Sequence, residues 1–244
     1  MMQYGLQLYS LRDMTGEDFE GALRTVAELG YSSVETAGFF GHSAEEVAAM
    51  LDRYHLTISS SHTGWRELTP DKLPETIRYH KTLGNPSIIV PGADLSTPAK
   101  LDAFIDLLND AEPKLAAEGI ALGYHNHDHE FMPNSWGILP HSEIERRTRV
   151  ELQIDTYWAY VAGLDPVETI TRLRDRIRSI HLKDGDLQKK GFALSEGAAP
   201  VAAVRKKAIA LGFGMIVESE GCDPTGAEEI GRCIRYLRKL DAED

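Results

Sequence analysis

The sequence predicts an α/β fold, a single (β/α)8 TIM barrel that covers residues 1–244. Short apolar runs alternate with longer segments of helical period along the whole chain, and no linker rich in Ser, Gly or Pro divides it. The length of 244 residues is typical of such a barrel folded as one domain. Strands that are each followed by a helix satisfy the right-handed crossover rule most simply when the sheet closes on itself. A doubly wound open sheet is the alternative, but no GxGxxG motif follows the first strand.

Each predicted strand is a short apolar run. The sixth, at residues 150–155, alternates apolar and polar side chains and ends on a carboxylate that would point into the mouth of the barrel. In chain order, the strands are expected at residues 4–9, 33–36, 57–61, 87–90, 120–125, 150–155, 177–182 and 214–218.

The segments between the strands have the apolar spacing of helices, and several carry a start or stop signal. Thr15 can cap the first helix, and Gly30, Gly84 and Gly212 each follow a helical segment, where a left-handed residue is expected. The segment at 142–147 is shorter than the others. The remaining helices are expected at residues 17–29, 44–54, 70–83, 98–117, 165–175, 200–211 and 225–240.

Composition argues against several classes of protein. The apolar share of 42% and charged share of 26% are those of a globular protein, and no apolar run approaches the roughly 20 residues that span a bilayer. The N-terminus has no basic segment followed by an apolar one, so we expect a cytoplasmic protein without a membrane partner. A net charge of −12 disfavours nucleic acid as a partner. Cys222 and Cys233 form no CxxC pair and predict no thiolate zinc site.

Residues 123–131, Gly-Tyr-His-Asn-His-Asp-His-Glu-Phe, carry three imidazoles and two carboxylates at the end of the predicted fifth strand. Imidazole nitrogens and carboxylate oxygens are ligands that Zn, Mn, Fe and Co accept. The histidines could instead make ordinary hydrogen bonds in a solvated loop, so a metal site requires matching ligands elsewhere. In a barrel these must come from the carboxyl ends of other strands, because barrel chemistry lies at that end.

Three later strands provide such ligands. Asp155 ends the sixth strand, His181 lies in the seventh, and Glu218 ends the eighth. Each has another explanation: Asp155 could cap a helix, His181 could be a hydrogen-bonded core residue, and Glu220 has the same facing as Glu218. Because oxygen ligands outnumber nitrogen, an open octahedral site for Mn, Co or Mg is favoured over a closed zinc site. Open positions indicate catalysis.

Other side chains near the strand ends suit a polyhydroxylated small molecule. An indole that can stack on a sugar face and four hydrogen-bonding groups make up this set: Gln7, His62, Asn126, Trp158 and Lys183. Structural roles are the alternative. Trp158 could pack in the core, and Lys183 could form a solvated ion pair with Asp184. We therefore expect a small carbohydrate as the partner.

These motifs resemble the xylose isomerase-like TIM barrels, which include sugar phosphate isomerases/epimerases, ketose 3-epimerases, inosose dehydratases, 3-keto-glycoside lyases and endonuclease IV. The resemblance runs nearly end to end and is specific for the superfamily more than for one reaction. It rests on the segments Gly5-Leu6-Gln7-Leu8-Tyr9-Ser10-Leu11-Arg12, Gly30-Tyr31-Ser32-Ser33-Val34-Glu35, Tyr124-His125-Asn126-His127, Asp155-Thr156-Tyr157-Trp158, His181-Leu182-Lys183-Asp184, Ser195-Glu196-Gly197 and Val217-Glu218.

The resemblance implies a metal held by Glu, Asp, His and Glu from strands five to eight, which places Asp155, His181 and Glu218 around it. The glutamate of strand five is replaced. At that position the chain has His125, and the next carboxylates are Asp128 and Glu130. Either Glu130 folds back to the metal or His125 coordinates in its place, and we favour Glu130.

The resemblance also implies proton abstraction α to a metal-polarised carbonyl, followed by reprotonation or by loss of a β-substituent. The catalytic candidates are His125, His127, Glu218 and Lys183. A histidine base suits elimination, whereas a second carboxylate from Glu130 would permit epimerisation.

We therefore expect a divalent-metal-dependent sugar isomerase, epimerase or lyase acting on a keto-sugar or sugar derivative, and the resemblance allows a homo-oligomer. One alternative is an endonuclease IV-like phosphodiesterase, which the acidic charge disfavours. The other is a non-catalytic sugar-binding barrel.

Overall fold

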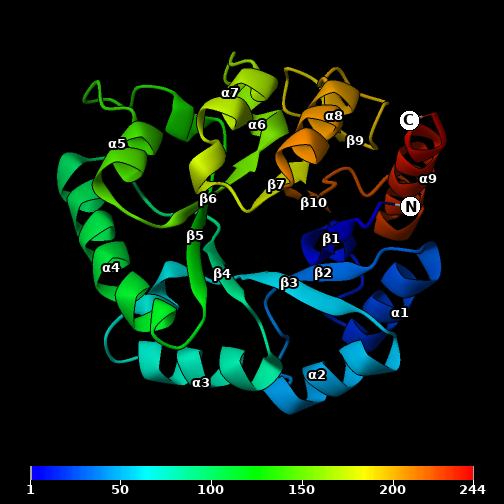
Figure 1. The fold of residues 1–244 in the computed structure, drawn as a ribbon, viewed down its shortest axis with the longest axis horizontal. Helices are drawn as coiled ribbons and strands as arrows, with labels where there is room; N and C mark the ends of the chain where they lie inside the picture. The colour runs from blue at the N-terminus through cyan, green and yellow to red at the C-terminus, as the bar shows by residue number, and fades with distance from the viewer. Residues whose placement is uncertain (1, 244) are drawn as a thin grey trace.

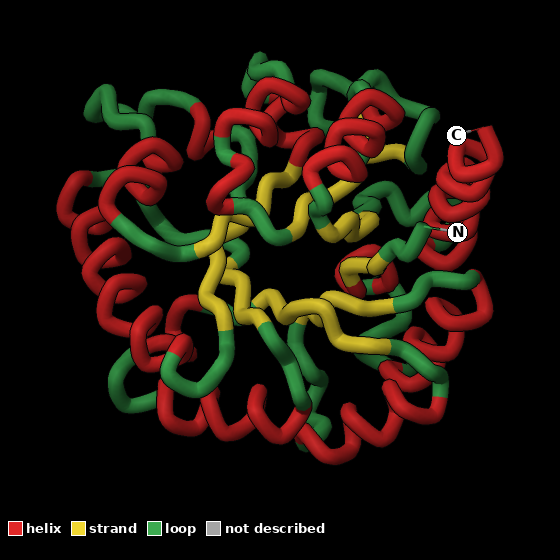
Figure 2. The backbone as a smooth tube through the Cα atoms, viewed as in Figure 1, coloured by secondary structure: helices red, strands yellow, loops and turns green. Residues whose placement is uncertain are grey.

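The predicted strands close into a barrel. The computed structural model describes residues 2–243, and its parallel strands follow one another around a closed barrel in the order β1-β10-β7-β6-β5-β4-β3-β2. Strands form the inner ring and helices the outer ring (Figures 1 and 2). The predicted (β/α)8 fold is thus confirmed. The barrel strands are β1 (Gly5–Gln7), β2 (Ser33–Ala37), β3 (Thr57–His62), β4 (Ser87–Val90), β5 (Ala121–His125), β6 (Glu151–Asp155), β7 (Ser179–Leu182) and β10 (Gly214–Val217).

Helices with one apolar face cover the outside of the barrel. None of them, within the part of the chain that the structure describes, is long and apolar enough to cross a membrane. They are α1 (Phe19–Leu29), α2 (Ala44–Arg53), α3 (Leu73–Leu83), α4 (Pro98–Ala116), α5 (Pro140–Arg147), α6 (Thr156–Val161), α7 (Pro166–Arg172), α8 (Val201–Leu211) and α9 (Gly226–Glu243).

The signals at helix ends were predicted correctly with one exception. Gly30, Gly84 and Gly212 have φ of 89°, 74° and 74° directly after α1, α3 and α8. These left-handed values favour glycine, which has no Cβ. The cap of α1 is Asp18, whose carboxylate accepts from a backbone N–H of the first turn. Thr15 lies too early, because its own N–H still donates to the turn that begins at Leu11.

Three local features differ from the prediction. The first strand ends at Gln7, because its side chain accepts from the Tyr9 N–H and starts the 3-10 helix η1 (Leu8–Leu11). Helix α6 follows β6 without a loop. A small antiparallel pair, β8 (Asp184–Gly185) with β9 (Gly191–Phe192), follows β7. Short 3-10 helices also occur at η2 (Trp65–Leu68), η3 (His129–Phe131) and η4 (Arg174–Arg176).

The interior of the barrel is polar near the carboxyl ends of its strands. Gln7 and Glu35 are 0% exposed and Gln153 is 1% exposed, although apolar side chains fill the layer between strands and helices. The register between β2 and β3 shifts at Val34/Glu35, so that Glu35 lies opposite Ser60. Such irregularities re-aim side chains, and they are common beside active sites. The polar interior adjoins the residues that the sequence marks as metal ligands.

Candidate metal centre

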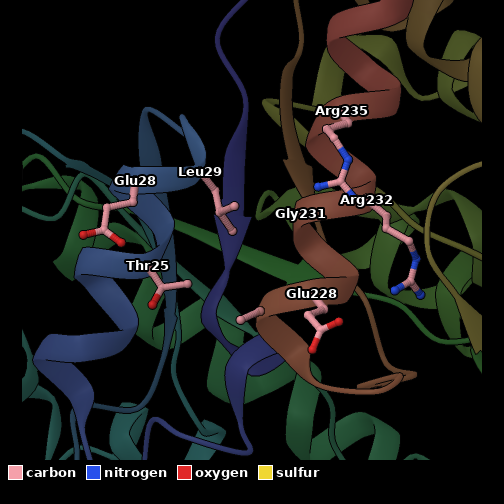
Figure 3. A pocket seen from close by; sticks show the side chains of 8 residues that line it. Thr25, Glu28, Leu29, Glu228, Gly231, Arg232 and Arg235 are labelled. Carbon is pink, nitrogen blue, oxygen red and sulfur yellow. The ribbon is translucent and has the colours of Figure 1, made fainter.

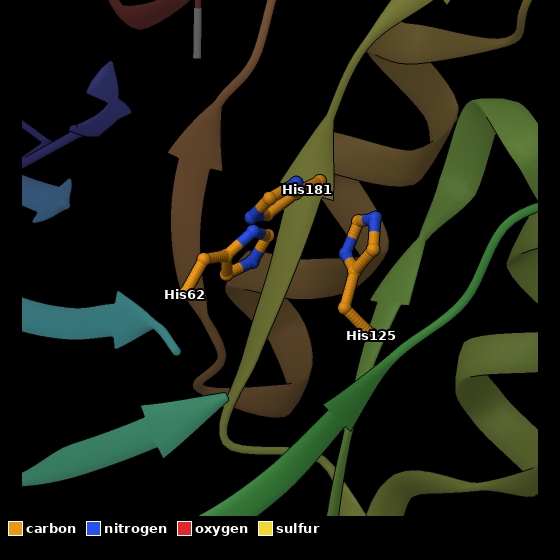
Figure 4. Close-up of side chains that lie close together, drawn as sticks. All are labelled: His62, His125 and His181. Carbon is orange, nitrogen blue, oxygen red and sulfur yellow. The ribbon is translucent and has the colours of Figure 1, made fainter. Parts of the chain in front are cut away.

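Neighbouring strand ends bring four potential metal ligands together. His125 ends β5, Asp155 ends β6, His181 lies in β7, and Glu218 follows β10. One nitrogen or oxygen of each lies within 4.8 Å of the others, and all four residues are buried. The pairing of β6 with β7 sets Asp155 opposite His181. His62, at the end of β3, forms an overlapping group with His125 and His181, and the three rings converge from different strands (Figure 4).

Two atoms of this group lack a hydrogen-bond partner within the protein. His125 Nδ1 and Asp155 Oδ2 are buried and make no hydrogen bond. A buried polar atom left unpaired costs about 1–3 kcal/mol, and a cation bound to both atoms would remove that cost. Two imidazole nitrogens and two carboxylate oxygens suit a divalent transition metal. These residues could therefore hold the metal that the sequence predicts.

Asp155 both caps a helix and faces the ligand group. Its Oδ1 accepts from the N–H groups of Tyr157 and Trp158, each at 2.9 Å, and so caps α6. Its Oδ2 makes no hydrogen bond, and the residue belongs to the ligand group. The helix cap that the sequence left open is therefore present on one oxygen, while the other oxygen makes no hydrogen bond and is available to a cation.

Lys183 lies inside the same cluster. Its Nζ is 3.6 Å from Asp155 Oδ2 and 3.6 Å from Glu218 Oε2, it forms an ion pair with Glu220, and it lies 4.7 Å from the centre of the Trp158 ring. The alternative of a solvated pair with Asp184 is wrong, because Lys183 and Asp184 are each 1% exposed. Successive residues point to opposite sides of an extended chain, which separates the two.

The burial of so many charges shifts their protonation equilibria. Burial raises the pKa of Asp155 to about 6, although Lys183 opposes the shift. Burial also opposes protonation of His181, but Glu35 and Glu218 outweigh it and raise its pKa to about 10. The pKa of Glu218 is held below its usual range, because Lys183 and His181 outweigh its burial. The pKa of His125 falls well below its ordinary value because the ring is buried.

Glu130, the ligand that the sequence analysis preferred, is outside both ligand groups. Its Oε1 accepts from the Tyr124 hydroxyl at 2.6 Å and its Oε2 from the His127 N–H at 2.8 Å. The carboxylate therefore anchors the loop after β5. The fold brings His125 to the strand-five position of the group, because β5 ends at that residue.

Two of the predicted substrate-binding residues are engaged within the protein. Asn126 donates to the Asp155 carbonyl at 3.3 Å and accepts from the Asp155 N–H at 3.1 Å, so it fixes the backbone of a candidate ligand. Gln7 donates to Glu35 at 2.7 Å and is 0% exposed. Both amides therefore have hydrogen-bond partners on neighbouring strands.

The sequence analysis did not assign a role to Glu35 or Gln153, which adjoin the histidines. Gln153 donates to Glu35 at 2.6 Å and lies 2.9 Å from His62 Nε2. The sequence did contain a signal for Glu35: a carboxylate inside a short apolar strand requires a charged or hydrogen-bonded partner. Its partners lie on distant strands, and sequence spacing could not identify them.

A cleft of about 430 Å³ opens at the strand ends beside the candidate ligands. His127 lines it, with a buried Nδ1 that has no hydrogen-bond partner. Trp158 is 7% exposed and lies beside Lys183 instead of among the lining residues. The cleft is lined by Tyr9, Ala37, Gly38, His62, Pro91, His125, His127, Glu218 and Glu220.

A second hollow, of about 460 Å³, lies on the outside of the barrel. Side chains of α1 and α9 form it, among them Glu28 and Arg235 (Figure 3). Its residues belong to neither ligand group. The cleft at the strand ends is therefore the candidate active site.

Comparison with known proteins agrees with this architecture. Residues 23–240 match the model of the xylose isomerase-like TIM barrel family. A sugar phosphate isomerase/epimerase from Parabacteroides distasonis ATCC 8503 has a similar structure, with a TM-score of 0.82, 27% identity, and 98% of each chain covered. An L-ribulose 3-epimerase shares the fold at a TM-score of 0.76 and 13% identity, with 98% of this chain and 94% of that chain covered.

An inosose dehydratase from Geobacillus kaustophilus (strain HTA426) is 26% identical over 186 residues, which are 66% of this chain and 60% of the dehydratase. The match thus spans less than two thirds of that relative's length. The fold is a (β/α)8 barrel with a cleft at the carboxyl ends of its strands. The chain belongs to the xylose isomerase-like TIM barrel family.

Proposed function

We propose that the protein is a divalent-metal-dependent lyase or isomerase/epimerase that acts on a keto-sugar or sugar derivative, with elimination as the favoured reaction. The observation that carries this proposal is the buried group of His125, Asp155, His181 and Glu218, in which two atoms lack a hydrogen-bond partner. The relatives named above, a dehydratase and two isomerase-type proteins, support the same reaction class.

The metal would be held by His125, Asp155, His181 and Glu218, and two imidazoles with two carboxylates suit a transition metal such as Mn or Co better than Mg. When bound, such an ion polarises a carbonyl oxygen and makes the neighbouring C–H bond more acidic. Lys183 adds a buried positive charge next to the carboxylates, because Glu218, Asp155 and Glu220 outweigh burial and raise its pKa. That charge would stabilise negative charge developing on the substrate oxygens.

His127 is suited to be the base. It lines the cleft, and burial lowers the pKa of its imidazole, so that a neutral ring with a free lone pair is favoured at pH 7. Its backbone N–H donates to Glu130 at 2.8 Å, which holds the residue in place. His127 would remove the proton α to the substrate carbonyl.

The contacts of Glu130 favour elimination over epimerisation. Epimerisation through two bases requires a proton acceptor on each face of the substrate. Glu130 would have supplied the second one, but Tyr124 and the His127 backbone engage its two oxygens. In the elimination, the α C–H bond breaks and its proton passes to His127. The electron pair forms a C=C bond, the β C–O bond breaks, and the protonated His127 gives its proton to the leaving oxygen, which departs as water.

Metal content tests the first part of this proposal. We expect about one divalent metal ion per chain in purified protein, measured by inductively coupled plasma mass spectrometry, and a large loss of metal in His181→Ala. A wild-type protein that stays folded and takes up no metal, even after incubation with Mn²⁺ or Co²⁺, would contradict it.

Proton exchange tests the second part. Incubation with inosose and a panel of keto-sugars in deuterated water should give loss of water or deuterium incorporation at the α-carbon, detected by NMR. Sugar binding without either reaction would favour a non-catalytic barrel. Cleavage of duplex DNA at abasic sites would instead support the phosphodiesterase alternative.

A further inference from the structure

Glu35 lies against two histidines of the candidate metal centre. Its Oε1 is 2.7 Å from His181 Nε2 and 3.1 Å from His62 Nε2. The residue is 0% exposed and belongs to neither group of candidate ligands. A buried carboxylate is expensive unless it is paired, so these contacts need an explanation beyond packing.

The other contacts of Glu35 hold its carboxylate in one orientation. Gln7 donates to Oε1 at 2.7 Å, while Ser60 and Gln153 donate to Oε2 at 2.5 Å and 2.6 Å. The register shift at Val34/Glu35 produces the pairing with Ser60. Three other strands, β1, β3 and β6, therefore position this carboxylate, which comes from β2.

The two ring nitrogens of His181 face different partners. Nε2 is 2.7 Å from Glu35 and Nδ1 is 2.8 Å from Glu218. An imidazole that binds a metal has given up one proton, and it keeps one N–H and one lone pair. When Nε2–H donates to Glu35, the lone pair is on Nδ1, the nitrogen that faces the candidate ligand Glu218. A carboxylate behind a metal-binding histidine commonly fixes the ring in this way.

We propose that Glu35 is a positioning residue for the metal centre, which fixes the tautomer and the ring orientation of His181 without binding the metal. The inference rests on the proposed metal centre. It also explains why the interior of the barrel is polar: Gln7, Ser60 and Gln153 orient the Glu35 carboxylate, and this carboxylate orients His181. His62 is oriented by the same oxygen at the edge of the cleft.

Metal affinity of Glu35 variants tests the inference. Glu35→Gln keeps the size of the side chain and removes the charge, and Glu35→Asp keeps the charge and shortens the reach. Mn²⁺ affinity is obtained by titrating the purified protein and measuring free Mn²⁺ by electron paramagnetic resonance. The stability of the metal-free protein is measured by thermal denaturation. We expect Glu35→Gln to bind Mn²⁺ about 10- to 100-fold more weakly than wild type, and Glu35→Asp to bind it several-fold more weakly.

Thr36→Val is the matched control. Thr36 is the next residue on β2, is 0% exposed, and its Oγ1 has no hydrogen-bond partner. The substitution is nearly isosteric, so Mn²⁺ affinity should stay within about twofold of wild type.

The outcomes separate the two proposals. If Glu35 merely stabilises the fold, Glu35→Gln will lower the melting temperature of the metal-free protein and leave Mn²⁺ affinity unchanged, which would overturn the positioning role. If Glu35→Gln does not fold, the Glu35→Asp variant is used instead. Wild-type Mn²⁺ affinity in folded Glu35→Asp would also overturn the positioning role. A folded wild-type protein that binds no Mn²⁺ would contradict the proposed metal centre itself.

Discussion

At the scale of single residues, hydrogen-bond partners decide which carboxylate can reach a metal. Asp155 ends β6 and Glu130 lies in the loop after β5, and both are buried. Two donors occupy the oxygens of Glu130, whereas Asp155 uses only one oxygen to cap α6. Asp155 is the better candidate for a metal ligand because its Oδ2 makes no hydrogen bond, and not because of its residue type.

This division of labour predicts different effects for two substitutions of Asp155. Asn is a good helix cap, so Asp155→Asn should keep α6 and lower metal affinity by at least about 100-fold. Asp155→Ala should lose the metal and destabilise the metal-free protein by a further ~1 kcal/mol relative to the Asn variant. Metal titration and urea unfolding measure the two effects. Equal stability of the two variants would argue against the cap.

The proposed base makes a second prediction at this scale. His127→Gln should lower kcat by about 10²- to 10⁴-fold, because the α-proton loses its acceptor. His127 lies outside both ligand groups, so metal content should be unchanged. Exposed His129, two residues further on, offers a matched control, and His129→Gln should retain activity. Full activity of His127→Gln would exclude it as the base.

At the scale of elements, Asp184 organises the loop after β7. Its carboxylate accepts from the backbone N–H groups of Gly185, Ser195, Gly197 and Ala199, at 2.8–3.1 Å. A Cβ at Gly197 would lie 2.3 Å from Asp184 Oδ1, so the close approach of this loop requires glycine. Lys183 and Asp184 are adjacent, yet Lys183 lies beside the candidate metal ligands and Asp184 accepts hydrogen bonds from this loop.

Asp184→Ala should therefore loosen the loop before it affects the barrel. Loss of several hydrogen bonds to a charged group should lower the free energy of unfolding by about 3 kcal/mol. Hydrogen exchange should accelerate at the amides of Ser195, Gly197 and Ala199, while barrel strands such as β5 keep their protection. Unchanged protection at those amides would contradict the role of Asp184.

At the scale of the whole molecule, a buried histidine that belongs to neither candidate ligand group links stability to pH. His80 in α3 is 2% exposed, and its Nδ1 lies 2.8 Å from the Asn85 amide nitrogen. Burial lowers its pKa to about 4. The unfolded chain, with a histidine pKa of about 6.5, binds more protons than the folded chain between these values.

The contribution of His80 is therefore fully present above about pH 6.5 and is lost as the pH falls towards 4. By pH 5 the loss amounts to about 2 kcal/mol. His80→Gln keeps an acceptor for Asn85 and does not titrate, so its unfolding free energy should fall less between pH 7 and pH 5. Urea unfolding at the two pH values measures this difference, and parallel losses in both proteins would refute the linkage.

The succession of strands and helices could be read from the sequence because it depends on local patterns. Gly84 and Gly212 ended helices as predicted, since a left-handed residue is a local requirement. The first strand was predicted too long, because its end depends on how the Gln7 side chain folds back. Helix α6 was not among the predicted helices, although the sequence left Asp155 open as a helix cap.

The sequence by itself determined the barrel and three of the four grouped residues, Asp155, His181 and Glu218, because alternation and strand ends are encoded in short segments. Tertiary structure decided that His125 joins them, that Glu130 anchors a loop, and that Glu35 lies behind His181. These outcomes depend on which side chains meet across strands far apart in the chain. Hydrogen bonds between distant strands form only when the barrel closes, so the spacing of residues along the chain cannot predict them.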